Sequence, residues 1–399
     1  MRLPVGGIEQ EITIESIVST DSLLRIKTFA NEFSSDEYSS TSSGNVTDGM
    51  IHAELTTSEN TSKMDIPISG DIYIPSTVPI IAAIDSFSQG TYMVPVFNIL
   101  SMSTQSYVMS VIRKKRSPNS EELLWEARTT YNEYRSTMLI NDKGEIILDE
   151  IPGGFVSYRE NKEQALKFNL KKNTDNDLLI DYAVKHTAPE VSNLRGSKRM
   201  KAKISGFDPN IFDLNDFNQS YSADSGIIII DTDNIFREVH IENNDTTATP
   251  FIQKNDQRII KQAELIRGNL TNTLQILNEI NFWLFENIKK EYRSSIPGAL
   301  EVLSKMVGDC NEHSILFAAL ARSLGIPCRI NIGLVYNNNM FQYHAWIQAF
   351  TDDRWHTFDP TFGQVPADAS HIKLLHGSLN KQIEILRIIN PTIDIIEVE

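Results

Sequence analysis

The sequence contains only two cysteines, Cys310 and Cys328, among 399 residues. This number excludes a disulfide scaffold, because small disulfide-stabilised domains carry several cysteines in a much shorter chain. A single bridge between the two is the one pairing available. The fold must therefore depend on hydrophobic cores, and either cysteine can remain a free thiol.

Positive charge is also scarce, since 37 Lys and Arg residues face 52 Asp and Glu residues and the formal net charge is −15. An acidic balance argues against nucleic acid as a main partner, because phosphate binding needs a basic face. It also argues against docking on an anionic membrane. The short basic runs at 113–116 and 195–203 fall where strands and turns are predicted, so we interpret them as solvated hairpin faces.

Long apolar runs are missing as well. No stretch approaches the ~20 apolar residues of a membrane helix, so we predict no membrane-spanning segment. Residues 1–7 hold no apolar run that could act as a signal peptide. This predicts a cytoplasmic protein, with a periplasmic or secreted location if a leader has been removed. The sequence leaves the oligomeric state open.

The composition that remains, with 41% hydrophobic and 22% charged residues, is typical of a globular protein. Residues 1–250 show mostly the period-two alternation of strands. Two short runs, 136–140 and 145–148, flank a turn that contains Gly144 and predict a hairpin. The segment 34–62 is rich in Ser, Thr, Asn and Gly, and we interpret it as a long surface loop.

The pattern changes near residue 250, after a polar stretch at 243–250 that ends in proline. Apolar residues then recur every three to four positions over 259–266 and 274–288, which predicts two amphipathic helices. We therefore predict a β-rich region of one or two domains at 1–250, able to bind a substrate or partner. A second domain is predicted at 251–399.

Chemistry-bearing residues gather in this second region. Asp309 is a good N-cap, and an apolar run at 315–324 closed by Gly325 predicts a helix that begins at Cys310. The first turn of a helix favours an anion through its unpaired N–H groups and its dipole. This position is therefore expected to lower the pKa of the Cys310 thiol.

A cysteine nucleophile needs a general base, which is usually histidine. His344 lies in a predicted strand at 341–350, and Asp359 ends the next one at 355–361. Adjacent antiparallel strands can bring these two into register, so that the carboxylate holds one ring nitrogen and Cys310 faces the other. This is the nucleophile, base and orienting group of a triad.

Four short sequences resemble those of the bacterial transglutaminase-like superfamily. They are Gly-Asp-Cys-Asn-Glu-His at 308–313, Leu-Gly-Ile-Pro at 324–327, Tyr-His-Ala-Trp at 343–346 and Phe-Asp-Pro-Thr-Phe-Gly at 358–363. The order and spacing of Cys310, His344 and Asp359 match the family, and 366–372 resembles a stretch of close bacterial members. Strong matching covers about residues 296–376.

The resemblance implies a papain-like α+β core in which the helix of the nucleophile packs on an antiparallel sheet. It implies catalytic roles for Cys310, His344 and Asp359, with no metal ion and no organic cofactor. Active members form a thioester acyl-enzyme and require an oxyanion hole. The backbone N–H of Cys310 is a natural donor, and Tyr292 and Asn311 are candidates for the second.

We expect a cysteine-dependent peptidase or amidase that acts on protein or peptide amides. Hydrolysis is favoured because the sequence shows no calcium loop of the kind that gates animal cross-linkers, and because water is the default acceptor. One alternative is a protein-glutamine acyltransferase, which would pass the acyl group to an amine. The other is a non-catalytic scaffold, in which the large β-rich region binds a partner.

Two further hypotheses concern residues near the nucleophile. A zinc site made by Cys310, His313, Cys328 and His344 is not favoured, because the spacings fit no compact tetrahedral site. Cys328 is expected in the core instead. His313, one turn after the nucleophile, is either an alternative base or a packing residue, and we favour packing.

Overall fold

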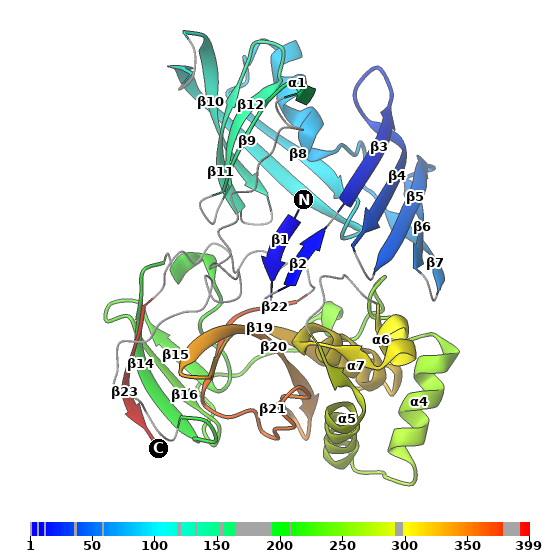
Figure 1. Cartoon of the computed structure of the whole chain (residues 1–399), viewed down its shortest axis with the longest axis vertical. Coiled ribbons are helices and arrows are strands. Elements are labelled where there is room, and N and C mark those ends of the chain that lie inside the picture. Colours follow the sequence, from blue (N-terminus) through cyan, green and yellow to red (C-terminus); the bar gives the residue numbers. More distant parts are fainter. Residues whose placement is uncertain are drawn as a thin grey trace.

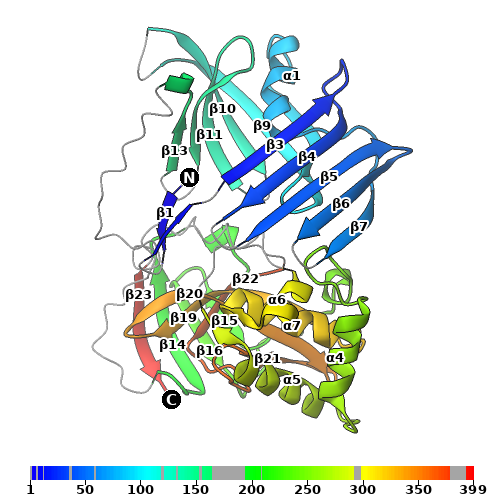
Figure 2. The same cartoon turned by 45° about the vertical axis from the view of Figure 1, so that its right-hand side comes forward.

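The structure is a computed structural model, and Figures 1 and 2 show it from two sides. It describes residues 2–5, 8–11, 13–35, 38–57, 60–117, 121–131, 134–151, 155–163, 194–207, 209–291, 298–377 and 392–399. Both views place a sheet-rich N-terminal half above a C-terminal half that contains most of the helices. Within the described ranges, no helix is long and apolar enough to span a membrane.

The N-terminal half contains two antiparallel sheets in which neighbouring strands follow each other in the chain. The five-stranded sheet consists of β3 (Thr13–Thr20), β4 (Ile26–Ser34), β5 (Ser39–Thr47), β6 (Met50–Thr57) and β7 (Thr61–Pro67). The six-stranded sheet consists of β8 (Thr91–Asn98), β9 (Ser103–Arg116), β10 (Leu123–Tyr131), β11 (Tyr134–Ile140), β12 (Ile146–Ile151) and β13 (Phe155–Tyr158). A hairpin of β1 (Arg2–Val5) and β2 (Ile8–Glu11), the 3-10 turn η1 (Pro75–Thr77) and the helix α1 (Val78–Ile84) complete this half.

The predicted surface loop at 34–62 is wrong, because β5, β6 and the first two residues of β7 lie there. Ile51, Ala53 and Leu55 of β6 alternate with polar residues, and all three are buried. The many Ser and Thr residues conceal this period-two pattern in the sequence. By contrast, the hairpin predicted at 136–148 is confirmed: β11 pairs with β12, and Gly144 in the turn has φ of +80°.

In the described part of the C-terminal half there are two more four-stranded antiparallel sheets and four α-helices. The helices are α4 (Gln257–Arg267), α5 (Thr273–Asn287), α6 (Ala299–Lys305) and α7 (Cys310–Ser323). The central sheet has the order β21 (Arg354–Phe358), β20 (Met340–Thr351), β19 (Cys328–Asn337) and β22 (His371–His376). The second has the order β15 (Gln219–Ser222), β16 (Ile227–Asp231), β14 (Arg199–Ser205) and β23 (Thr392–Val398). Short elements complete it: η2 (Pro209–Ile211), η3 (Asn243–Asp245), and the parallel pair β17 (Lys289–Lys290) and β18 (Val307–Gly308).

Helix α7 is the centre of this half. Leu316, Phe317 and Leu320 have no exposed surface, and the helix packs against β19 and β20 and against α4, α5 and α6. It ends before Gly325, whose φ of +79° suits a residue without a side chain. The helices predicted over 259–266 and 274–288 are confirmed as α4 and α5. The predicted α+β class, with a β-rich N-terminal region and the cysteine's helix on an antiparallel sheet, is also confirmed.

The division of the chain into 1–250 and 251–399 stays a prediction. Strand β14 pairs with β23. Met200 on β14 and Ile393 on β23 belong to the same hydrophobic core as α7. Segments on both sides of residue 250 therefore build the C-terminal half. At the junction itself, Phe251 packs into the core under the five-stranded sheet, whereas Ile252 packs into the C-terminal core.

A buried ionic cluster joins the central sheet to the segment before β15. Asp216 has no exposed surface, and its carboxylate lies 2.8 Å from the Lys373 Nζ on β22 and 3.3 Å from an Arg329 nitrogen on β19. Gln348 of β20 donates a hydrogen bond of 2.7 Å to the same carboxylate. Burial alone would raise the pKa of Asp216, but Lys373 and Arg329 hold it below its usual value.

Replacing Asp216→Ala should lower the free energy of unfolding by about 3–5 kcal/mol, because it removes the anion between two buried cations and leaves Lys373 with only the partly exposed Asp213. Urea denaturation followed by circular dichroism measures this. Asp233→Ala is the matched control: its ion pair with Lys198 is largely exposed and screened by water, so we expect a much smaller loss. Equal losses in the two variants would contradict the assigned role of Asp216.

Candidate active site

Cys310 is the first residue of α7, and a capping box fixes the start of this helix. The Asp309 carboxylate accepts the N–H of Asn311 at 2.8 Å, and the Glu312 carboxylate accepts the N–H of Asp309 at 2.8 Å. Gly308 permits this arrangement, because a Cβ there would collide with the Glu312 side chain. The N-cap predicted at Asp309 is confirmed.

The expected low pKa of the Cys310 thiol is wrong. Burial raises this pKa well above the ordinary value, and the neighbouring Asp309 and Glu312 carboxyl groups raise it further. A hydrogen bond from the backbone N–H of Ala345 acts in the opposite direction. The capping box thus places acidic groups at the helix end that would otherwise stabilise a thiolate, so the resting thiol keeps its proton.

His344 of β20 and Asp359, directly after β21, form a buried pair. The His344 Nε2 lies 2.9 Å from the Asp359 Oδ2, with 6% of the histidine and none of the aspartate exposed. The other oxygen, Oδ1, accepts the N–H groups of Thr361 and Phe362 at 2.8 and 3.0 Å. An ionised Asp359 fixes the proton of a neutral His344 on Nε2, which leaves the lone pair on Nδ1.

The structure brings Cys310 next to this pair. Ala345, whose N–H reaches the Cys310 sulfur, directly follows His344 in β20. Opposite His344 in the register is Gly333 of β19, where any Cβ would collide with the Ile372 carbonyl. Gly333 thus permits the close approach of β19 and β22 in the part of the sheet that carries His344.

Aromatic packing holds the plane of the His344 ring. The Phe362 ring stacks on it with centroids 5.0 Å apart, and the Arg195 guanidinium carbon lies over the Phe362 ring, 4.3 Å from its centroid. Trp346 is stacked at 6.3 Å and is 2% exposed. These contacts, together with Asp359, leave the imidazole little freedom to rotate.

Two residues to which the sequence analysis assigned no role complete the site. The His371 Nε2 lies 2.9 Å from the same Asp359 Oδ2, and its Nδ1 lies 3.1 Å from the Asp368 Oδ1. The Asp368 carboxylate also accepts the N–H of Gly196 at 2.8 Å and an amide N–H of Gln364 at 2.6 Å. The available signal was the acid and histidine three positions apart at 368 and 371, within the segment that resembles close family members.

The contacts among Asp359, Asp368 and His371 shift the pKa values of all three side chains. Burial would lower the pKa of His371, but its hydrogen bonds to Asp359 and Asp368 raise it to about 9. Burial would raise the pKa of Asp359, yet His344 and His371 hold it far below its usual value. The pKa of Asp368 is lowered in the same way, with His371 outweighing the effect of burial.

The remaining candidates take other roles. The Nδ1 of His313 donates to the Asp309 carbonyl at 2.6 Å, and burial lowers the pKa of this ring to about 4, which supports packing. Burial raises the pKa of the Cys328 thiol to about 12, and this residue has no exposed surface. For the oxyanion hole, the backbone N–H of Asn311 is already bonded to Asp309, and Tyr292 lies outside the described residues.

Among the residues that the structure describes, one group of three His and Asp side chains lies close enough together to be considered as a metal site. Ligand atoms of His344, Asp359 and His371 lie within 4.8 Å of one another, and all three residues are buried. This set differs from the zinc site weighed from the sequence, since it contains no cysteine. The Nε2 atoms of His344 and His371 each lie 2.9 Å from the Asp359 Oδ2, which is the length of a hydrogen bond, and we therefore interpret the group as hydrogen-bonded rather than as a metal site.

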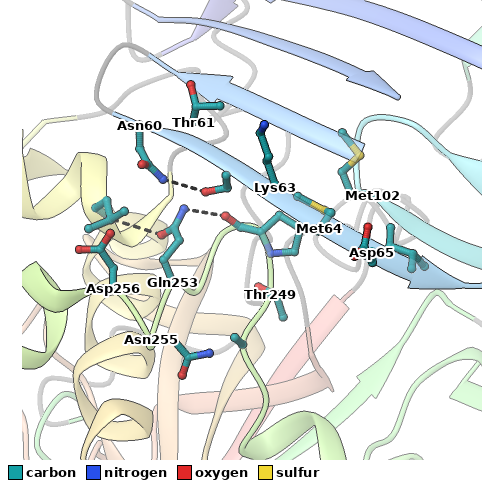
Figure 3. A pocket seen from close by; sticks show the side chains of 15 residues that line it. Asn60, Thr61, Lys63, Met64, Asp65, Met102, Thr249, Gln253, Asn255 and Asp256 are labelled. Atoms are coloured by element: carbon teal, nitrogen blue, oxygen red, sulfur yellow. Dashed lines mark hydrogen bonds between the residues drawn. The ribbon is translucent and has the colours of Figure 1, made fainter. Parts of the chain in front are cut away.

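A separate pocket of about 520 Å³ lies between the two halves, next to β7 (Figure 3). It is bordered by residues 60–66 on one side and 248–256 on the other. Gln253 closes one wall through hydrogen bonds to the Pro250 carbonyl and the Leu300 N–H. None of the proposed catalytic residues lines this pocket, so it is not part of the candidate active site.

The stability of the fold should depend on pH through His371. Its pKa rises from 6.5 to about 9 on folding, so its contribution is complete below pH 6.5 and is lost as the pH rises to 9. The total is about 3 kcal/mol, since one pKa unit corresponds to 1.36 kcal/mol. Urea denaturation at a series of pH values should show this slope in the native chain and not in His371→Gln. Parallel slopes would contradict the charge assigned to His371.

Comparisons with known proteins agree with this part of the fold. Residues 260–360 match the family model of the transglutaminase-like superfamily. A comparison with curated proteins found no match.

Several solved structures are similar at low identity. A candidate cysteine protease from Cytophaga hutchinsonii is 16% identical over 50% of this chain and 86% of its own, with a TM-score of 0.33. The periplasmic domain of TgpA from Pseudomonas aeruginosa is 13% identical over 42% and 72%, with a TM-score of 0.29. A candidate protease from Parabacteroides distasonis is 9% identical over 82% and 63%, with a TM-score of 0.23. At these TM-scores the assignment depends on the family match alone. The chain therefore carries a transglutaminase-like domain at residues 260–360.

Proposed function

We propose that this chain is a cysteine-dependent amide hydrolase, a peptidase or amidase that acts on protein or peptide amides through a thioester acyl-enzyme. One observation carries the proposal: the buried His344–Asp359 pair lies beside the start of α7, where the N–H of Ala345 reaches the Cys310 sulfur. The family match at 260–360 supports a cysteine-dependent enzyme.

The first half-reaction transfers the acyl group to the enzyme. Because the resting thiol is protonated, the His344 Nδ1 takes the proton of Cys310 as the sulfur attacks the amide carbonyl. The Asp359 carboxylate stabilises the imidazolium that forms. The Cys310 N–H, in the first turn of α7, has no acceptor within the helix and can donate to the oxyanion. His344 then gives the proton to the departing amine.

The second half-reaction restores the enzyme. Water attacks the thioester carbonyl and loses a proton to the His344 Nδ1, and the carbon–sulfur bond breaks. The carboxylic acid leaves, and the proton on His344 returns to the Cys310 sulfur. An amine in place of water would give acyl transfer through the same steps, so the acceptor decides between the two reactions.

A mixture of peptides and a glutamine-containing protein tests the reaction type. The native chain and Cys310→Ala are each incubated with it and with a labelled primary amine, and mass spectrometry follows the products. Peptide cleavage or deamidation that is absent in Cys310→Ala supports hydrolysis. Amine incorporation without comparable hydrolysis would replace this proposal with acyl transfer, and equal product patterns from both proteins would favour a non-catalytic scaffold.

The roles of the pair make a quantitative prediction. On a peptide that the native chain cleaves, His344→Ala and Asp359→Asn should each lower kcat/KM by at least about 10³-fold, because the base is lost or its tautomer is wrong. His356→Ala is the control, since His356 lies on β21 outside this site. A loss below tenfold in Asp359→Asn would remove Asp359 from the mechanism.

A further inference from the structure

We propose that His371 is a positioning residue of the candidate active site. As an imidazolium held between Asp359 and Asp368, it shares the Asp359 carboxylate with His344 and thereby keeps the Cys310–His344 pair uncharged at rest. This inference rests on the proposed function, because it assigns regulation of the same site.

The geometry places His371 and His344 on one oxygen atom. Both Nε2 atoms lie 2.9 Å from the Asp359 Oδ2, and the two ring centroids are 5.7 Å apart. His371 is only 4% exposed and lies at the first position of β22. Water therefore screens little of the interaction between the two rings.

A count of donors and acceptors gives the protonation of His371. Its Nδ1 faces only acceptors, the Asp368 carbonyl at 3.0 Å and the Asp368 Oδ1 at 3.1 Å. Its Nε2 faces the Asp359 Oδ2, and the other oxygen of this carboxylate, Oδ1, accepts the N–H groups of Thr361 and Phe362. Since an ionised carboxylate has no proton to donate, both nitrogens of His371 must carry one.

The charges around His371 agree with this count. Asp359 and Asp368 face it from the segment between β21 and β22, and His344 faces it from β20. Beyond Asp368, an Arg195 nitrogen lies 3.6 Å from the carboxylate. The cations Arg195 and His371 thus balance the carboxylates of Asp359 and Asp368. A neutral His371 would leave one buried negative charge without compensation.

This arrangement weakens the support that Asp359 gives to a charged His344. In a simple triad the carboxylate stabilises the imidazolium of the base alone. Here one imidazolium already occupies the same oxygen, and its charge opposes a second one nearby. Transfer of the Cys310 proton to His344 is therefore disfavoured until the sulfur attacks the carbonyl carbon of a bound substrate. The resting cysteine stays a thiol, which is less prone to oxidation than a thiolate.

The rate of Cys310 alkylation by iodoacetamide across pH tests the proposal, with mass spectrometry to assign the cysteine. His371→Gln keeps an N–H donor for Asp359 but removes the charge. We expect the rise in rate to move to lower pH by about one unit, which is about tenfold faster labelling at pH 7. His376→Gln, on the same strand, should match the native profile.

The direction in which the pH profile of Cys310 alkylation shifts distinguishes an electrostatic role of His371 from a purely structural one. If His371 only held Asp359 in position, its replacement would weaken the contact between Asp359 and His344. The alkylation rate would then rise at the same pH as in the native chain or at a higher pH. Either result overturns the proposal. A His344→Ala variant separates this outcome from a failure of the proposed function. If the labelling of Cys310 does not depend on His344, the proposed Cys310–His344 pair is wrong.

Nitrogen-15 NMR of histidine in the native chain gives a second test that needs no folded variant. At pH 7.5 we expect both ring nitrogens of His371 to be protonated. A neutral His371 overturns the proposal. The metal content of the purified native chain is a further check. The proposal is overturned if stoichiometric zinc is present and if its removal by a chelator changes the His371 resonances. His344, Asp359 and His371 would then bind an ion instead of forming hydrogen bonds with one another.

Discussion

The site depends on one constraint, the complete burial of the Asp359 carboxylate. A buried anion persists only where hydrogen bonds replace the water that it has lost. Two backbone N–H groups and two histidines supply these bonds, and they come from the turn after β21, from β20 and from β22. The segment between β21 and β22 must therefore fold back over the central sheet. The orientation of His344 is a consequence of satisfying Asp359.

The same rule governs the other ionic cluster of the central sheet, where Asp216 is buried with Arg329 and Lys373. It connects the sheet to a segment that lies before residue 250 in the chain. The second sheet adds to this connection, since β14 and β23 lie on opposite sides of the proposed catalytic residues in the sequence. The C-terminal half is thus tied together by long-range contacts, whereas the two N-terminal sheets are built from neighbouring strands.

Local features of the sequence predicted much of this structure. Helix α7 was recognisable from its N-cap and glycine stop, and His344 and Asp359 were placed together because β20 and β21 are consecutive strands; their catalytic roles stay a prediction. The pairing of His371 with Asp359 depends on a loop whose path no periodicity records. The pKa of Cys310 was predicted in the wrong direction because the helix dipole was considered without the burial and the capping carboxyl groups that oppose it. Strands β5 and β6 were missed because polar residues conceal their alternation.

The pairing of β14 with β23 also bears on how the protein is made. Strand β14 emerges from the ribosome long before its neighbour β23, so one edge of its sheet stays open until residues 392–398 have been synthesised. An open edge offers unpaired N–H and C=O groups to other chains. A product that stops before Thr392 would keep every proposed catalytic residue and yet expose this edge. Aggregation is therefore the expected fate of such a truncated chain.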